Sequence, residues 1–126
     1  LVLSTYNDKG QSNSSAYLRA LDVSNLELNA DLVVLSGCET GVNKYDNSLG
    51  LGGLTESFMQ AGSNNLIASL WKVNDRVTEK MMTEFYKGYT NGLSIQDSLW
   101  QAQKHIRETR KTQHPKYWAG WFLMSK

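Results

Sequence analysis

The chain has 126 residues and a net charge of +1, from 13 Lys and Arg against 12 Asp and Glu with both histidines neutral. This length suits one domain, and 40% hydrophobic residues suffice for a buried core. The small net charge disfavours a nucleic-acid-binding protein, which needs a basic surplus to contact phosphates. The single cysteine, Cys38, excludes an internal disulfide framework and a zinc site with several thiolates, and we expect no metal and no cofactor.

Short segments of different character alternate in the first 28 residues. Leu1–Ser4 is apolar and predicts a short strand. Residues 7–15 are polar and rich in turn-forming types, which indicates a surface loop. A short helix is expected from Ser24 to Leu28, with Ser24 as its N-cap.

Two continuous apolar runs, Leu32–Leu35 and Leu66–Trp71, predict strands that are buried on both faces, as in a parallel sheet. A polar, glycine-containing loop at 41–53 follows the first run and precedes a helix. That helix is predicted from apolar residues at helical spacing and a closing glycine: Leu54, Phe58, Ala61 and Gly62.

The second half predicts two amphipathic helices. Asn74 caps the first of them, and Asn91-Gly92 ends it. Ser94, with Asp97 three residues later, begins the second helix in the manner of a capping box, and His114-Pro115 ends it. The apolar stripe of the first helix comprises Val77, Met81, Phe85 and Tyr89, with Met82 and Tyr86 beside it, and that of the second comprises Ile95, Leu99, Ala102 and Ile106.

A last strand is expected at Ala119–Met124, within an aromatic segment that forms either part of the core or an exposed recognition surface. Strands and helices thus alternate along the chain. This order predicts an α/β fold with a largely parallel sheet.

Two loops leave the carboxyl ends of the predicted strands, where ligands and catalytic groups gather in open parallel sheets. The first loop contains Gly37 and Cys38, and the second runs from Trp71 to Asp75. A cysteine among small residues is placed as a nucleophile would be, and Gly37 with nearby backbone amides could donate to an oxyanion. A buried, unreactive cysteine at a strand end is the alternative.

A nucleophilic cysteine needs a base, and the chain offers His105 and His114. His105 also fits a solvated helix position, and His114 fits a structural role near a helix end. Neither flanks a carboxyl-end loop, so we assign neither as the base. Glycines before a helix suggest a phosphate site, although their spacing matches neither common phosphate-binding motif: Gly50, Gly52 and Gly53.

Several ordered motifs resemble the CHAT family of caspase-like domains, which are often attached to TPR repeats. The segment Ala30–Gly41, ADLVVLSGCETG, resembles the family's cysteine motif, with Gly37 in place of the commoner Ala. Ile67–Asp75 resembles its SLWxVxD segment. Further matches are Leu49–Leu51, Phe58, Ala61-Gly62, Phe85-Tyr86, Ala102-Gln103 and His114–Trp121.

The resemblance implies a caspase-like three-layer α/β sandwich with a mostly parallel sheet, incomplete at its N-terminal side. Residues 1–126 would form the C-terminal part of this single domain. It also implies a cysteine endopeptidase of the separase-related type, in which a His–Cys dyad works through an acyl-enzyme at Cys38. No histidine precedes Cys38 here, so we expect the dyad histidine to lie outside this chain and the chain alone to be inactive.

The same resemblance makes Asp75 a candidate carboxylate of the S1 pocket for a basic P1 side chain, with Trp71 as a possible wall. Asp75 could equally be a helix-start residue that complements the helix dipole. A tryptophan at a strand end more often belongs to the core.

Three functional hypotheses follow. The first is a CHAT-type peptidase of the bacterial type, cytoplasmic, with a protein or peptide substrate and TPR or other regulatory domains as partners, but no nucleic acid and no membrane. The second is a catalytically inactive caspase-like protein-interaction module. The third is a ligand-binding domain that uses the glycine-containing loop for an anion.

Overall fold

The computed structural model describes residues 18–36 and 51–126. The strand expected at Leu1–Ser4, the loop expected at 7–15 and the Cys38 segment lie outside the described residues. In chain order the elements are α1 (Ala20–Ser24), β1 (Val33–Leu35), α2 (Leu51–Gln60), β2 (Asn65–Ser69), α3 (Asp75–Thr90), α4 (Ile95–Glu108), the 3-10 helix η1 (Pro115–Tyr117) and β3 (Trp121–Ser125).

The described strands form one sheet in the order β1-β2-β3, with β2 in the middle. β1 and β2 are parallel, and Leu35 is paired with Ala68. This pairing confirms the two strands expected from continuous apolar runs. β2 is buried from Leu66 to Ser69 as expected, whereas β1 is buried at Leu35 and half-buried at Val33 and Val34. β2 and β3 are antiparallel, and Ser69 is paired with Trp121. The prediction of a mostly parallel sheet is therefore wrong for the described strands, since parallel and antiparallel pairing each occur once.

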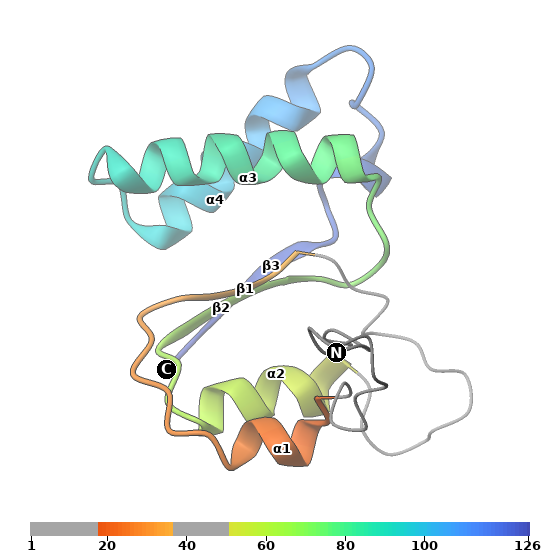
Figure 1. The fold of residues 1–126 in the computed structure, drawn as a ribbon. Coiled ribbons are helices and arrows are strands. Elements are labelled where there is room, and N and C mark those ends of the chain that lie inside the picture. The colour runs from red at the N-terminus through yellow and green to blue at the C-terminus, as the bar shows by residue number, and fades with distance from the viewer. Residues whose placement is uncertain (1–17, 37–50) are drawn as a thin grey trace, which may run out of the picture.

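Two helices between β2 and β3 explain the antiparallel pairing. α3 leads away from the carboxyl end of β2, and α4 runs back along it (Figure 1). The chain therefore enters β3 at the edge of the sheet that it left after β2. One crossover helix would have returned the chain to the opposite edge and made β3 parallel.

Helices cover both faces of the sheet, so the described residues form three layers (Figure 1). α1 and α2 lie on one face, and α3 and α4 lie on the other. Consecutive side chains of β2 point to opposite faces, as in any strand. Leu66 joins the core beneath α1 and α2, whereas Ile67 joins the core beneath α3 and α4, and both are 0% exposed.

The two long helices begin at the predicted N-caps. Asn74 accepts a hydrogen bond from the backbone N–H of Arg76 at 3.1 Å. The Ser94 hydroxyl accepts from the Asp97 N–H at 3.0 Å and donates to the Asp97 carboxylate at 2.7 Å. Each cap satisfies one of the backbone donors that a helix start leaves unpaired.

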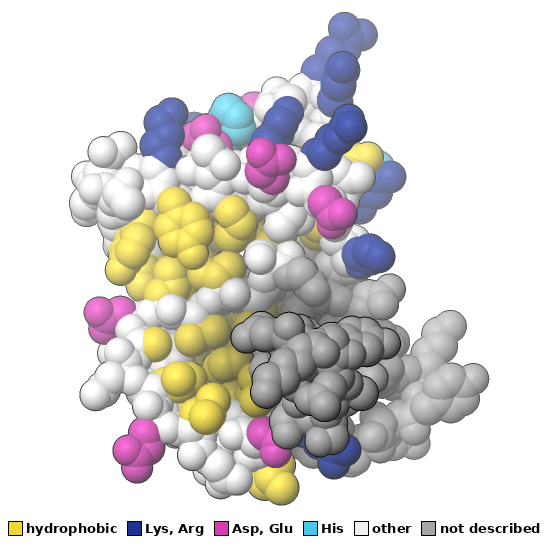
Figure 2. All heavy atoms as spheres, viewed as in Figure 1, with side chains coloured by type: hydrophobic (Ala, Val, Ile, Leu, Met, Phe, Trp, Pro, Cys, Tyr) yellow, Lys and Arg dark blue, Asp and Glu magenta, His cyan; other side chains and the backbone are white. Residues whose placement is uncertain are grey.

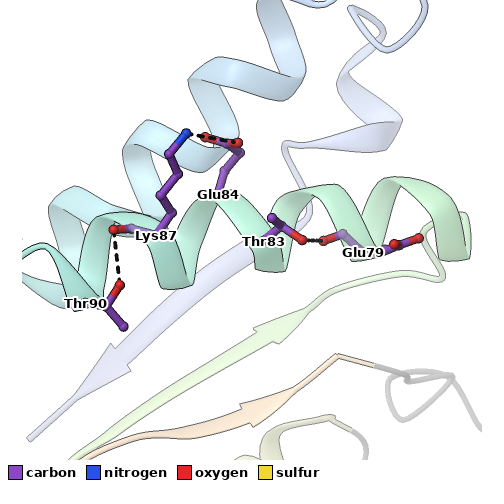
Figure 3. A network of polar contacts seen from close by, with 5 residues as sticks. All are labelled: Glu79, Thr83, Glu84, Lys87 and Thr90. Carbon is purple, nitrogen blue, oxygen red and sulfur yellow. Dashed lines mark hydrogen bonds and ion pairs between the residues drawn. The ribbon is translucent and has the colours of Figure 1, made fainter.

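Most of the predicted apolar stripe of each long helix is buried. Tyr89, which was expected in the stripe, is exposed instead, as is Tyr86 beside it. Polar side chains of α3 interact with other residues of the same helix (Figure 3). The Thr83 hydroxyl donates a hydrogen bond to the Glu79 carbonyl at 2.8 Å, and Lys87 forms an ion pair with Glu84 at 3.9 Å. The buried stripe residues are Val77, Met81, Phe85, Leu99, Ala102 and Ile106.

Three helix boundaries differ from the prediction. α2 begins at Leu51, so residues 51–53 belong to its first turn and not to the loop expected at 41–53. Ser24 is the last residue of α1 and not its N-cap, because its hydroxyl donates to the Leu21 carbonyl at 2.9 Å. The start of α1 is instead held by Asp22, whose carboxylate accepts from the Arg19 N–H at 2.8 Å. α4 ends at Glu108, well before His114-Pro115, because Thr109 already has an extended backbone.

Gly62 closes the turn after α2, as predicted. Its φ is +113°, in the region that favours glycine. A side chain at this position would also overlap the carbonyl oxygen of Leu28. Gly62 therefore allows the segment after α1 to lie against the end of α2.

Candidate functional site

The carboxyl ends of β1 and β2 lie side by side. The parallel register joins Val34 to Ile67 and Leu35 to Ala68, so both strands end at the same edge of the sheet. The segment after β1 leads to Gly37 and Cys38, whose positions lie outside the described residues, as do Glu39 and Thr40. The two loops singled out from the sequence thus leave one edge, which is where α/β folds gather ligands.

The loop after β2 is held by the segment before β3. The Leu70 N–H donates to the Gly120 carbonyl at 2.9 Å, and the Trp71 indole N–H donates to the Lys116 carbonyl at 2.8 Å. A Cβ added to Gly120 would lie 2.6 Å from Cε2 of Trp71, so the indole packs directly on this glycine.

Trp71 therefore connects the loop after β2 to the segment before β3, and it stays partly exposed to solvent. Its side chain is 39% exposed, so it is not part of the buried core that one interpretation expected. Its indole fixes the path of the loop through Lys116 and Gly120.

Asp75 is the first residue of α3, directly after the N-cap Asn74. This position confirms the helix-start interpretation, since an acidic residue in the first turn complements the helix dipole. The side chain is exposed, and it forms no ion pair with any residue in the described part of the chain. Its carboxylate is accordingly free to meet a cation from solvent.

An open hollow of about 300 Å³ lies between the loop after β2 and η1. It is lined by Lys72, Val73, Asn74, Lys116 and Tyr117. Two ammonium groups and a phenol suit an anionic or polar group better than a cationic one. Asp75 does not line this hollow, so a basic side chain would reach Asp75 from outside it.

Sequence reasoning did not single out this lysine-lined hollow. Lys72 could have been noticed, because it follows β2 within the loop already under consideration. Lys116 and Tyr117 could not, because they reach the hollow through η1, and only the fold brings η1 beside that loop.

Both histidines have structural surroundings. His105 is exposed on α4. His114 caps η1, and its Nδ1 accepts from the Lys116 N–H at 3.2 Å. These observations agree with the solvated and end-capping interpretations and give no support to either residue as a catalytic base.

Metal and phosphate sites find no further support. Within residues 18–36 and 51–126, no group of three or more His, Cys, Asp and Glu could hold a metal ion. Gly52 and Gly53 fall in the first turn of α2, while Gly50 lies outside the described residues, so the phosphate hypothesis stays a prediction. No helix in the described part is long and apolar enough to cross a membrane.

Comparison with known proteins gives one family and two relatives. A model of the CHAT domain family matches residues 1–126. Tetratricopeptide repeat protein 28 of Mus musculus is 34% identical over 107 residues, which cover 85% of this chain and 4% of that protein. Tetratricopeptide repeat protein 28 of Homo sapiens is 33% identical over the same length, again covering 85% of this chain and 4% of that protein.

The chain thus spans about 4% of the length of these relatives. Both relatives are mammalian, so the expectation of a bacterial-type protein is not borne out. No solved structure matches the chain.

Proposed function

The chain belongs to the CHAT domain family, and on that premise we propose that it is the C-terminal part of a single caspase-like cysteine endopeptidase domain. One observation supports this most: β1 and β2 are parallel and end at the same edge, so the cysteine segment and the Trp71–Asp75 loop both start there. This is the arrangement that a nucleophile and a substrate-binding loop require.

In this proposal, the Cys38 thiolate attacks the carbonyl carbon of the scissile peptide bond. Backbone amides near Gly37 and Cys38 donate to the oxyanion that forms. A dyad histidine from outside this chain first takes the thiol proton and then gives it to the leaving amine. Water, deprotonated by the same histidine, hydrolyses the thioester at Cys38 and releases the free acid.

The substrate is a protein or peptide that binds along the carboxyl edge. Asp75 would pair with an Arg or Lys side chain at P1, since its carboxylate is exposed and has no ionic partner among the described residues. The partly open ring of Trp71 would form one wall beside it. The bracing of Trp71 by Lys116 and Gly120 would keep that wall rigid.

Adjoining repeat domains would regulate this activity. The two relatives are named as tetratricopeptide repeat proteins, and they are far longer than the matched segment. We accordingly propose TPR or other regulatory domains in the full-length protein that contains this chain. A reducing compartment such as the cytoplasm would keep the Cys38 thiol free.

The test compares the full-length protein with its Cys38→Ala variant. Each is incubated with cell extract, and newly formed protein N-termini are sequenced. We expect cuts that depend on Cys38 and that follow Arg or Lys. Cuts that persist in Cys38→Ala would remove Cys38 as the nucleophile, and Cys38-dependent cuts after other residues would remove Asp75 from the S1 pocket.

The alternative is a catalytically inactive caspase-like interaction module. It predicts no Cys38-dependent cuts and no histidine at the dyad position of the full-length protein. The rate at which iodoacetamide alkylates Cys38 distinguishes this outcome from an enzyme that lacks its activator. A nucleophile within a dyad reacts fast because its pKa is lowered, whereas an inert packed thiol reacts slowly.

A further inference from the structure

The outer face of α4 carries an aromatic and basic stripe, in which Trp100 and Arg107 are exposed and Lys104 is half-buried. Leu99, Ala102 and Ile106 turn inward and are buried. Trp100, Lys104 and Arg107 follow at helical spacing on the opposite side, and Trp100 is 59% exposed. So large an exposed indole beside cations is a typical component of a protein-binding surface.

This stripe forms one side of a small hollow of about 110 Å³, which we call the α4 hollow. Gln103 fixes its other side, because its side-chain amide donates to the carbonyls of Trp118 and Trp121 at 3.0 and 2.9 Å. The segment before β3 is thus tied to α4, and the hollow is held by two elements. Its lining residues are Trp100, Gln103, Lys104, Arg107 and Trp118.

Each cation of the hollow lies over one indole. The Lys104 ammonium is 5.2 Å from the ring centroid of Trp100, and the guanidinium carbon of Arg107 is 5.8 Å from that of Trp118. Cation–π contacts hold these side chains in place without neutralising their charge. Among residues 18–36 and 51–126, the ion pair within 4.0 Å is Glu84–Lys87, so neither Lys104 nor Arg107 has a carboxylate partner there.

The surrounding segment concentrates the positive charge of the chain. Residues 104–116 hold five of the 13 Lys and Arg but one of the 12 Asp and Glu, which gives this segment +4 and the rest of the chain −3. Lys and Arg side chains gather over the layer of α3 and α4 in Figure 2 and are sparse over the layer of α1 and α2. The net charge of +1 is therefore the sum of a basic segment at residues 104–116 and an acidic remainder of the chain.

We propose that the α4 hollow binds an acidic peptide segment, in which an apolar side chain is flanked by Asp or Glu. The hollow is far smaller than the pockets of about 300–1,000 Å³ that hold cofactors or drug-sized ligands, and it suits one side chain. The indoles receive that apolar side chain. Arg107 pairs with one carboxylate through two hydrogen bonds, and Lys104 attracts a second as a point charge.

A peptide fits this surface better than a nucleic acid does. Proteins that bind single strands stack bases on open aromatic faces. Here each indole has a cation over one face, so the two rings offer no continuous open platform for successive bases, and what remains of their surface in the hollow receives one apolar side chain. The site also shares no residue with the carboxyl edge of β1 and β2, so the proposal does not depend on peptidase activity.

The experiment selects peptides from a random displayed library on the full-length protein and measures the dissociation constants of the selected peptides by fluorescence anisotropy. We expect selected sequences with one apolar residue among Asp and Glu. Their affinity should fall by about tenfold or more in Arg107→Glu and in Trp100→Ala, as for central interface residues. Both side chains are exposed, so both variants should fold.

Lys80→Glu is the matched control, because Lys80 is an exposed cation of α3 outside the hollow and its replacement changes the net charge equally. It should change the affinity by less than about threefold, since exposed charges away from a contact contribute little. Selection without acidic sequences, or an equal loss in Lys80→Glu, would overturn the proposal. So would tighter binding of single-stranded oligothymidylate that is lost in Arg107→Glu.

Discussion

At the scale of single residues, one substitution separates the helix-start role of Asp75 from its proposed role in the S1 pocket. Asp75→Asn keeps the shape of the side chain and removes its charge. Loss of the helix-dipole interaction should reduce the free energy of unfolding by only about 0.3–1 kcal/mol. Loss of the proposed S1 carboxylate should lower kcat/KM for a peptide with Arg at P1 by about a hundredfold, since breaking a recognition ion pair is costly.

The control for Asp75 is its neighbour, the N-cap residue. Asn74→Ala removes the hydrogen bond from Arg76 and should cost about 1 kcal/mol of stability without changing the P1 preference. The S1 assignment would be wrong if Asp75→Asn cleaved Arg and non-basic peptides in the wild-type ratio.

The contact between Trp71 and Gly120 makes a second prediction at this scale. A Cβ at Gly120 would displace the Trp71 ring, so Gly120→Ala should destabilise the domain by about 1–3 kcal/mol, as overpacking does. In a Trp71→Ala background the same change should cost much less, because the obstructing ring is gone. Hydrogen exchange of the β2 amides in the full-length protein gives the four free energies of this double-mutant cycle. Equal costs in both backgrounds would contradict the contact.

At the scale of elements, two serines of one helix should respond with opposite sign. Ser94 exchanges two hydrogen bonds with Asp97 at the start of α4. The hydroxyl of Ser98 is buried against Gly88 of α3 and has no hydrogen-bond partner in the described part of the chain. Ser94→Ala should therefore cost about 1 kcal/mol, whereas Ser98→Ala should stabilise by about 1 kcal/mol, since a buried unpaired hydroxyl is costly.

Thermal unfolding of the two variants, recorded side by side in one buffer, checks this pair. Ser94 is the N-cap outside α4, whereas Ser98 lies within the helix, so the higher helix propensity of Ala adds to the gain expected at Ser98 alone. A lower transition temperature for Ser98→Ala would mean that its hydroxyl makes a hydrogen bond in solution.

The elements that the sequence predicts well are those with local signals. α3 and α4 have side-chain caps and a long apolar stripe, and their starts are where the sequence places them. α1 has five residues and no stripe, so nothing local locates it. The direction of β3 depends on how the two helices between β2 and β3 pack together, which is a long-range property. The presence of two helices in this connection, and not one, already favoured an antiparallel β3.

The candidate site was predictable to a similar extent. The sequence placed Asp75 directly after its N-cap, where α3 begins. It did not predict that Trp71 would rest on Gly120 and bond to Lys116, because these residues are 45 or more positions away along the chain. Hydrogen bonds and close contacts between distant segments require the fold, and periodicity carries no information about them.

At the scale of the whole molecule, β2 is the element on which both helical layers depend. It pairs with β1 on one side and with β3 on the other, and its two faces belong to the two separate cores. Removing either layer would expose one face of the sheet with its buried apolar residues, Leu66 on one side and Ile67 on the other. The two layers should therefore unfold together, even though their side chains form distinct clusters.

Leu66→Ala and Ile67→Ala test this dependence, because the two residues are adjacent and fully buried on opposite faces of β2. Each should cost about 2–5 kcal/mol, as large-to-small core substitutions do. Hydrogen exchange in the full-length protein should show the same loss of protection in α2 and in α3 for either variant. Leu21→Ala, at a leucine that is 72% exposed, should change protection by less than about 0.5 kcal/mol. If Leu66→Ala weakens α2 and leaves α3 protected, the layers are separate units, and β2 does not couple them.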